Sequence, residues 1–174
     1  EEKVLRISQS SGGVIDPDTS TDCTSCIAFA NMYDSLVVPN MDNEPEPSLA
    51  ESWETSEDGL TWTFKLREHY WNDGEQVKAE DYVYAFQRMF DPSTASSGVQ
   101  FFLSLENAQE IVNGTKDVEE LGVSAPDDMT VVFKLTKPVT YFDMILGSPV
   151  AFPQRKDIVE KYGDSYGADK DSLV

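Results

Sequence analysis

Residues 60–66 read Leu-Thr-Trp-Thr-Phe-Lys-Leu, with an apolar side chain at every second position. Strict alternation of this kind predicts a β-strand with one buried face and one solvated face. Residues 49–54 precede an Asp58-Gly59 turn signal and are expected to form a second strand. Residues 80–90 follow with apolar side chains at helical spacing and end before an Asp-Pro pair, which predicts a helix.

The rest of the chain continues this mixture of strands and helices. Residues 39–47 are expected to form a polar connector between two sub-lobes, and residues 127–128 a turn. Because hairpin-spaced strands and separate helices do not alternate regularly, the expected fold class is α+β, or mixed α/β. The further expected elements are strands at residues 4–8, 121–123 and 130–135, and helices at residues 22–36, 105–113, 141–146 and 155–162. The aromatic residues at core positions are Trp53, Trp62, Phe64, Tyr82 and Phe86.

Composition and charge exclude several classes of function. The 174 residues include 13 Lys and Arg against 32 Asp and Glu, which gives a net charge of −19. Such a chain repels phosphate backbones and anionic lipids, so we expect no nucleic-acid partner. No apolar run approaches the roughly 18 residues that a membrane-spanning helix needs. We therefore expect no direct membrane insertion, with a lipid anchor as the one exception.

Catalytic and metal-binding residues are scarce in this sequence. The single imidazole, His69, leaves no material for a His-based triad or a multi-His metal site. No nucleophile–base pair and no phosphate-binding loop is found either. The residues by themselves therefore predict an acidic globular domain that is not an enzyme and holds no cofactor or metal.

Two short motifs resemble chemical sites. Cys23-Thr24-Ser25-Cys26 is a C-x-x-C pair at the start of a predicted helix, which suits either a redox pair or two small helical residues; we favour the second interpretation. Residues 16–22 place oxygen-bearing side chains like the start of a calcium loop. The loop glycine is replaced by Thr21 and the closing glutamate by Ile27, so we interpret these carboxylates as turn and helix-cap groups.

Ten short segments, taken in their order along the chain, point to a known protein family. The segments are residues 48–54, 58–67, 71–74, 77–84, 87–88, 91–96, 121–123, 127–128, 137–142 and 159–163. Together they closely resemble the N-terminal part of the peptide-binding family of bacterial ABC-transporter extracellular solute-binding proteins, family 5. Within that family the chain is most similar to the oligopeptide-binding proteins. The resemblance covers residues 4 to about 163.

The resemblance implies a periplasmic-binding-protein-like fold, in which two lobes close over a ligand. It implies that residues 1–44 are the N-terminal segment of a split main lobe. Residues 45–174 would then be an inserted sub-domain, truncated before the chain returns to the main lobe.

The resemblance also implies a function and candidate binding residues. The protein would be the extracytoplasmic subunit of an importer, monomeric, and either periplasmic or anchored outside a Gram-positive cell. It would bind oligopeptides through their main chains and deliver them to a membrane permease. Thr21, Asp22 and Cys23 would lie along the ligand, and Gly98 stands where family members often place a ligand-contacting tyrosine. The alternatives are the same fold with a nickel complex, haem or an oligosaccharide as ligand, or a C-x-x-C redox domain.

Overall fold

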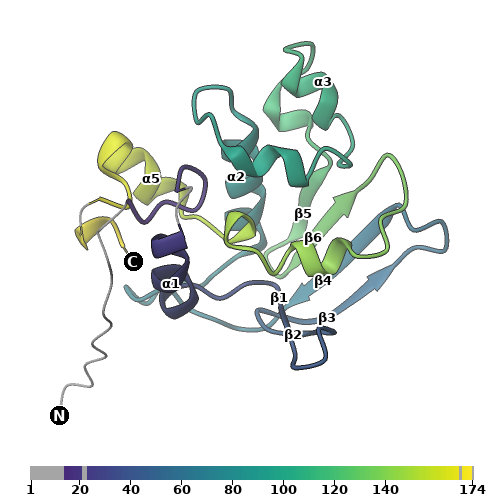
Figure 1. Ribbon diagram of the computed structural model, residues 1–174, viewed down its shortest axis with the longest axis horizontal. Helices are drawn as coiled ribbons and strands as arrows, with labels where there is room; N and C mark the ends of the chain where they lie inside the picture. Colours follow the sequence, from purple (N-terminus) through teal and green to yellow (C-terminus); the bar gives the residue numbers. More distant parts are fainter. Residues whose placement is uncertain (1–13, 21–22, 169, 174) are drawn as a thin grey trace.

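A four-stranded antiparallel sheet forms the centre of the structure, a computed structural model that describes residues 14–20, 23–168 and 170–173 (Figure 1). The strand order is β3-β4-β6-β5. These strands are β3 Ala50–Thr55, β4 Thr61–Leu66, β5 Val123–Asp127 and β6 Thr130–Lys134. The expected strands at 49–54, 60–66 and 130–135 are therefore confirmed, as is the turn before β6. The strand expected at 121–123 is wrong in extent, because pairing with β6 begins only at Val123 and continues to Asp127.

Helix α2, Ala79–Phe90, packs against β5 and β6 and covers one face of the sheet. The carboxylate of Asp81 accepts a hydrogen bond from the Lys78 backbone N–H at 2.9 Å, which satisfies one of the free donors at the amino end of the helix. The helix ends where Asp91-Pro92 begins, as the sequence predicts.

Aromatic side chains fill the space between α2 and the sheet. The Phe86 ring lies 5.1 Å from Phe133 of β6 and 4.9 Å from Phe102, both in edge-to-face geometry. Of the five expected core aromatics, four are buried: Trp62, Phe64, Tyr82 and Phe86. Trp53 is half-buried and packs against the same core.

In the described part of the chain, four further helices and a small hairpin pack around this core. They are α1 Cys23–Met32, β1 Val37–Pro39, β2 Pro45–Pro47, α3 Ala108–Val112, α4 Phe142–Ile145 and α5 Lys156–Tyr162. Short 3-10 segments join them: η1 Ser97–Phe101, η2 Val118–Glu120, η3 Pro149–Ala151, η4 Gly163–Ser165 and η5 Lys170–Ser172. Within the described part of the chain, no helix is both long enough and apolar enough to cross a membrane.

Three further sequence-based expectations need correction. Residues 39–47 are not an open connector, because β1 and β2 pair antiparallel across them. The Asn40 side chain closes their turn by accepting hydrogen bonds from the Asp42 and Glu44 backbone N–H groups. The helix expected over 105–113 begins only at Ala108, after Asn107 in a left-handed conformation (φ 64°). The helix expected to reach residue 36 ends at Met32. The strand expected at 4–8 lies outside the described residues.

The two ends of the described chain lie side by side at the end of the molecule that carries α5 (Figure 1). The Ile15 backbone N–H donates to the Gly167 carbonyl at 2.7 Å. A Cβ atom at Gly167 would lie 2.5 Å from the Ile15 carbonyl carbon and oxygen, and Gly167 has a positive φ of 74°. Only glycine permits this close approach.

Gly167→Ala is expected to destabilise the fold more than Gly74→Ala. Both glycines have positive φ, but a Cβ atom at Gly74 would meet nothing within 4 Å. Gly74→Ala should therefore cost about 1–2 kcal/mol from the left-handed backbone alone. Gly167→Ala should cost about 1–3 kcal/mol more, because the backbone of residues 15–16 must move. Urea unfolding of both variants measures the difference, and equal costs would contradict the close contact.

Candidate functional site

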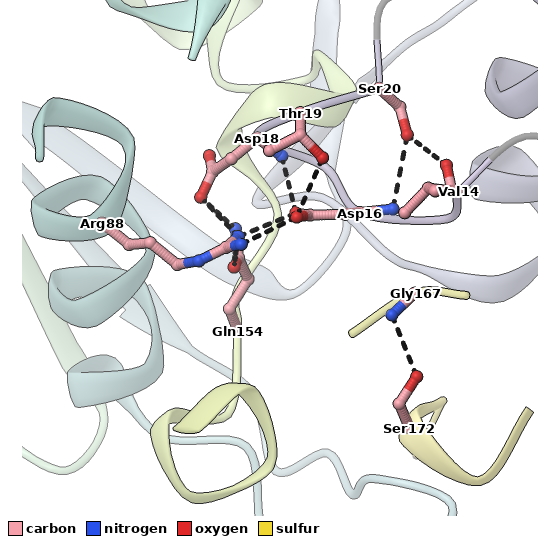
Figure 2. Close-up of polar contacts among 9 residues, drawn as sticks. All are labelled: Val14, Asp16, Asp18, Thr19, Ser20, Arg88, Gln154, Gly167 and Ser172. Carbon is pink, nitrogen blue, oxygen red and sulfur yellow. Dashed lines mark hydrogen bonds and ion pairs between the residues drawn. The ribbon is translucent and has the colours of Figure 1, made fainter. Parts of the chain in front are cut away.

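Three buried polar side chains and the partly buried Arg88 meet where the two ends of the described chain join α2 (Figure 2). Arg88, in the last turn of α2, binds Asp16 through two hydrogen bonds of 2.7 Å, one from each terminal nitrogen. Its Nη1 also donates to Asp18 Oδ2 at 2.9 Å and to Gln154 Oε1 at 2.8 Å. Gln154 Nε2 completes the ring by donating to Asp18 Oδ2 at 2.9 Å. We refer to these four residues as the Arg88 cluster.

The local sequence explains how the two carboxylates reach the arginine. Asp16 caps its own turn, because its Oδ1 accepts from the Asp18 backbone N–H and its Oδ2 from the Thr19 hydroxyl. This is the turn role that the sequence predicts. The sequence does not reveal the second role: both carboxylates also bind the guanidinium of Arg88, so a cation bound at these oxygens would have to displace it.

Burial sets the electrostatics of the cluster. The side chain of Asp18 is fully buried, that of Asp16 is 5% exposed and that of Arg88 is 15% exposed. Asp18 Oδ1 has no hydrogen-bond partner among the described residues. Burial raises the pKa of Asp18 to about 7, against the opposing effects of Arg88 and Gln154. Burial also opposes the charge on Arg88, but the hydrogen bond and charge of Asp16 outweigh it and hold the pKa of Arg88 above its usual value.

The free energy of unfolding should fall as pH rises from about 5 to about 6.5, because of Asp18. Its pKa is about 7 in the folded state and about 4 in an unfolded chain. Between these values the folded state binds one more proton, so stability decreases by about 1 kcal/mol per pH unit. Asp18→Asn keeps an acceptor for Arg88 but cannot titrate. Urea unfolding at several pH values should therefore show this slope in the difference between wild type and Asp18→Asn. A difference that does not change with pH would contradict it.

An aromatic chain connects the Arg88 cluster to α1. The Arg88 guanidinium lies over the ring of Tyr166, 5.3 Å from its centre. The Tyr166 and Tyr33 hydroxyls lie close enough to influence each other's pKa, and burial raises the pKa of both. Tyr33 follows α1 directly and stacks on Phe152 at 5.3 Å, and Phe152 also contacts Phe29 of α1.

The structure places the sequence-predicted binding residues in different surroundings. Thr21 and Asp22 lie outside the described residues. Cys23 is the first residue of α1. Gly98 is buried in η1, where a Cβ atom would lie 3.1 Å from Val150 Cβ and 3.2 Å from Met89 Sδ. Gly98 therefore packs tightly against η3 and α2, and a larger side chain at position 98 would require these neighbours to shift by a few tenths of an ångström.

Among the described residues, the geometry gives no support to the metal hypothesis. In the part of the chain that the structure describes, no group of three or more His, Cys, Asp or Glu side chains could hold a metal ion. His69 lies at the surface, and its Nε2 is 3.5 Å from an Asp34 carboxylate oxygen.

Comparison with known proteins places the fold in a family. Residues 44–174 match the family model described as bacterial extracellular solute-binding proteins, family 5 Middle. The chain belongs to this family. The resemblance and the fold class inferred from the sequence are therefore confirmed.

Individual members of the family 5 solute-binding proteins align along most of the chain. This chain is 36% identical over 155 residues to the periplasmic oligopeptide-binding protein OppA of Salmonella typhimurium. The alignment covers 87% of this chain and 28% of OppA. The structure of the pheromone receptor PrgZ superimposes with a TM-score of 0.91 and 31% identity, over 95% of this chain and 33% of PrgZ. The structure of Haemophilus influenzae OppA in complex with the peptide RPPGFSPFR superimposes with a TM-score of 0.84 and 35% sequence identity. The superposition covers 91% of this chain and 31% of that OppA chain. The chain thus spans about a third of the length of these relatives.

Proposed function

We propose that this chain is part of the solute-binding subunit of an ABC importer and that the subunit binds oligopeptides. The observation that carries this proposal is the likeness to Haemophilus influenzae OppA, whose structure contains a bound peptide. The two OppA proteins are named as oligopeptide-binding proteins, and PrgZ is named as a receptor. The proposal therefore includes no catalytic activity.

The proposed mechanism is capture of an extended peptide between two lobes. Hydrogen bonds to the ligand main chain give affinity for many sequences, and water-filled pockets accept different side chains. Residues 1–44 and 45–174 would belong to the main lobe and to an inserted sub-domain, with the boundary in the loop between β1 and β2. Thr21, Asp22, Cys23 and Gly98 remain the proposed ligand contacts. Hinge closure would present the loaded protein to a membrane permease.

The proposed location follows from the relatives' names. The Salmonella typhimurium protein is called periplasmic. We propose an extracytoplasmic protein, monomeric, in the periplasm or anchored at the outer surface of a Gram-positive cell. An acidic chain of net charge −19 also attracts cationic peptides at low ionic strength.

Isothermal titration calorimetry tests the peptide proposal. The sample is the longest form of the protein that its gene encodes, since the ligand would lie between two lobes. The probes are the peptide RPPGFSPFR and a mixed library of tri- to hexapeptides, with a mixture of free amino acids as the control. We expect binding of one peptide per protein with a Kd in the micromolar range or below, about −8 kcal/mol or stronger.

Two results would count against this function. Absence of heat with every peptide would remove the peptide class. Binding of a nickel complex, haemin or an oligosaccharide in the same assay, without peptide binding, would favour the alternative in which this fold carries another solute.

A further inference from the structure

The Arg88 cluster joins three segments that are far apart in the sequence. The bonds of Arg88 to Asp16, Asp18 and Gln154 connect residues 72, 70 and 66 positions apart, and Gln154 is 136 positions from Asp18. Arg88 belongs to α2, whose opposite face is packed into the aromatic core. The arginine therefore holds residues 14–20 against a rigid part of the fold.

Both ends of α1 are tied to this cluster. Near its first turn, the Ser25 hydroxyl donates to the Val14 carbonyl at 3.4 Å. After its last residue, the Tyr33 ring stacks on Phe152, two positions before Gln154 of the cluster, with ring centres 5.3 Å apart. Movement of residues 14–20 away from Arg88 would therefore free α1 to shift, including its first residue, Cys23.

The composition of the Arg88 cluster suits it to setting the position of residues 14–20, and less to increasing the stability of the fold. A buried ion pair contributes little net stability compared with apolar side chains of the same volume. Here a planar guanidinium binds one carboxylate with both nitrogens and shares a second carboxylate with an amide. Such a fork accepts its partners in one arrangement only. The cluster thus fixes one position of residues 14–20.

We propose that Arg88 is a positioning residue for peptide binding, which acts by holding residues 14–20 and the amino end of α1 in the binding geometry. This inference rests on the proposed function. Arg88 acts through Asp16, Asp18 and Gln154, without contact with the peptide.

The test compares Arg88→Gln and Arg88→Lys with Arg155→Gln in the longest form of the protein. Arg155 is a matched control, because its side chain is 14% exposed, close to the 15% of Arg88, yet its partners Asp73 and Asp157 are 35% and 63% exposed. Calorimetry uses RPPGFSPFR, or the library peptide that wild type binds with the largest heat. It is run at a temperature where circular dichroism shows each variant to be folded.

We expect Arg88→Gln to weaken peptide binding by about tenfold or more, because the binding-competent fraction falls to about a tenth. Arg88→Lys should have a peptide affinity between those of wild type and Arg88→Gln, since an ammonium cannot bind Asp16 with two nitrogens. Arg155→Gln should stay within about twofold of wild type. Hydrogen exchange should accelerate in residues 14–20 and 23–32 of the Arg88 variants and stay unchanged in the Arg155 variant.

The outcomes separate this inference from the proposed function. If wild type binds a peptide and the folded Arg88 variants bind it equally well, the positioning role is wrong and the peptide function stands. If wild type binds no peptide, the proposed function fails. Independently of that result, unchanged hydrogen exchange in residues 14–32 of the Arg88 variants would refute the proposal that Arg88 holds this segment in place. If Arg88→Gln does not fold, Arg88→Lys and Gln154→Ala decide by the same two readouts.

Discussion

Arg88→Gln is expected to lower the free energy of unfolding by about 3–5 kcal/mol near neutral pH. The substitution leaves the carboxylates of Asp16 and Asp18 buried without their cation. Glutamine can donate to one of them but cannot balance their charge. The loss should be smaller at about pH 5, because a buried carboxylate without its arginine takes up a proton more readily. Urea unfolding at both pH values measures the two effects.

Arg155→Gln is the control for this prediction as well. Its partners, Asp73 and Asp157, lie nearer to solvent and can be hydrated when the arginine is removed. The expected loss is about 1 kcal/mol or less. If the two substitutions cost the same, burial of the Asp16–Asp18 pair does not govern the stability of the Arg88 cluster.

Phe133→Ala is expected to cost about 3–5 kcal/mol. Phe133 is fully buried in β6, and its ring contacts Phe64, Phe86 and Phe142 at 5.1 to 5.9 Å. Its removal opens a cavity where β4, β6, α2 and α4 meet, and the sheet cannot collapse to fill it. Thermal or urea unfolding, followed by tryptophan fluorescence, gives the loss directly.

Phe101→Ala separates burial from residue type in this prediction. The Phe101 side chain is 52% exposed. Its removal should change the free energy of unfolding by about 0.5 kcal/mol or less. A comparable loss for both phenylalanines would contradict the assignment of the aromatic core to the space between α2 and the sheet.

The parts of the fold that the sequence predicts well are those governed by local periodicity. Residues 61–66 alternate strictly, and all three of Trp62, Phe64 and Leu66 are buried. The helix expected at 80–90 appears as α2 because its apolar stripe faces a sheet that gives it a partner. In both cases the pattern and the tertiary environment agree.

The sequence does not predict the hairpin of β1 and β2, because its local signals compete. Prolines at both ends of residues 39–47 argue against strands, since proline cannot donate to a ladder. In the structure these strands are short, with three residues each, and the Asn40 side chain supplies the hydrogen bonds that close their turn. Side-chain closure of this kind leaves no periodic pattern.

The Arg88 cluster could not be predicted from periodicity either. Gln87-Arg88 is part of the string of segments that carries the family resemblance, but the partners of Arg88 lie 66 to 72 positions away. The available signal was the Asp16-Pro17-Asp18 turn, which places two carboxylates close together. Its interpretation as a turn is correct for Asp16, and only the folded chain reveals the arginine that both carboxylates bind.

A peptide footprint by hydrogen exchange tests most directly whether this part of the protein contacts a peptide ligand. The longest form of the protein is compared with and without saturating RPPGFSPFR, or the library peptide that binds best. We predict slower exchange at the amino end of α1, around Cys23, and in residues 96–101 around Gly98, with the sheet strands unchanged. Peptide binding with no change in either segment would contradict the account.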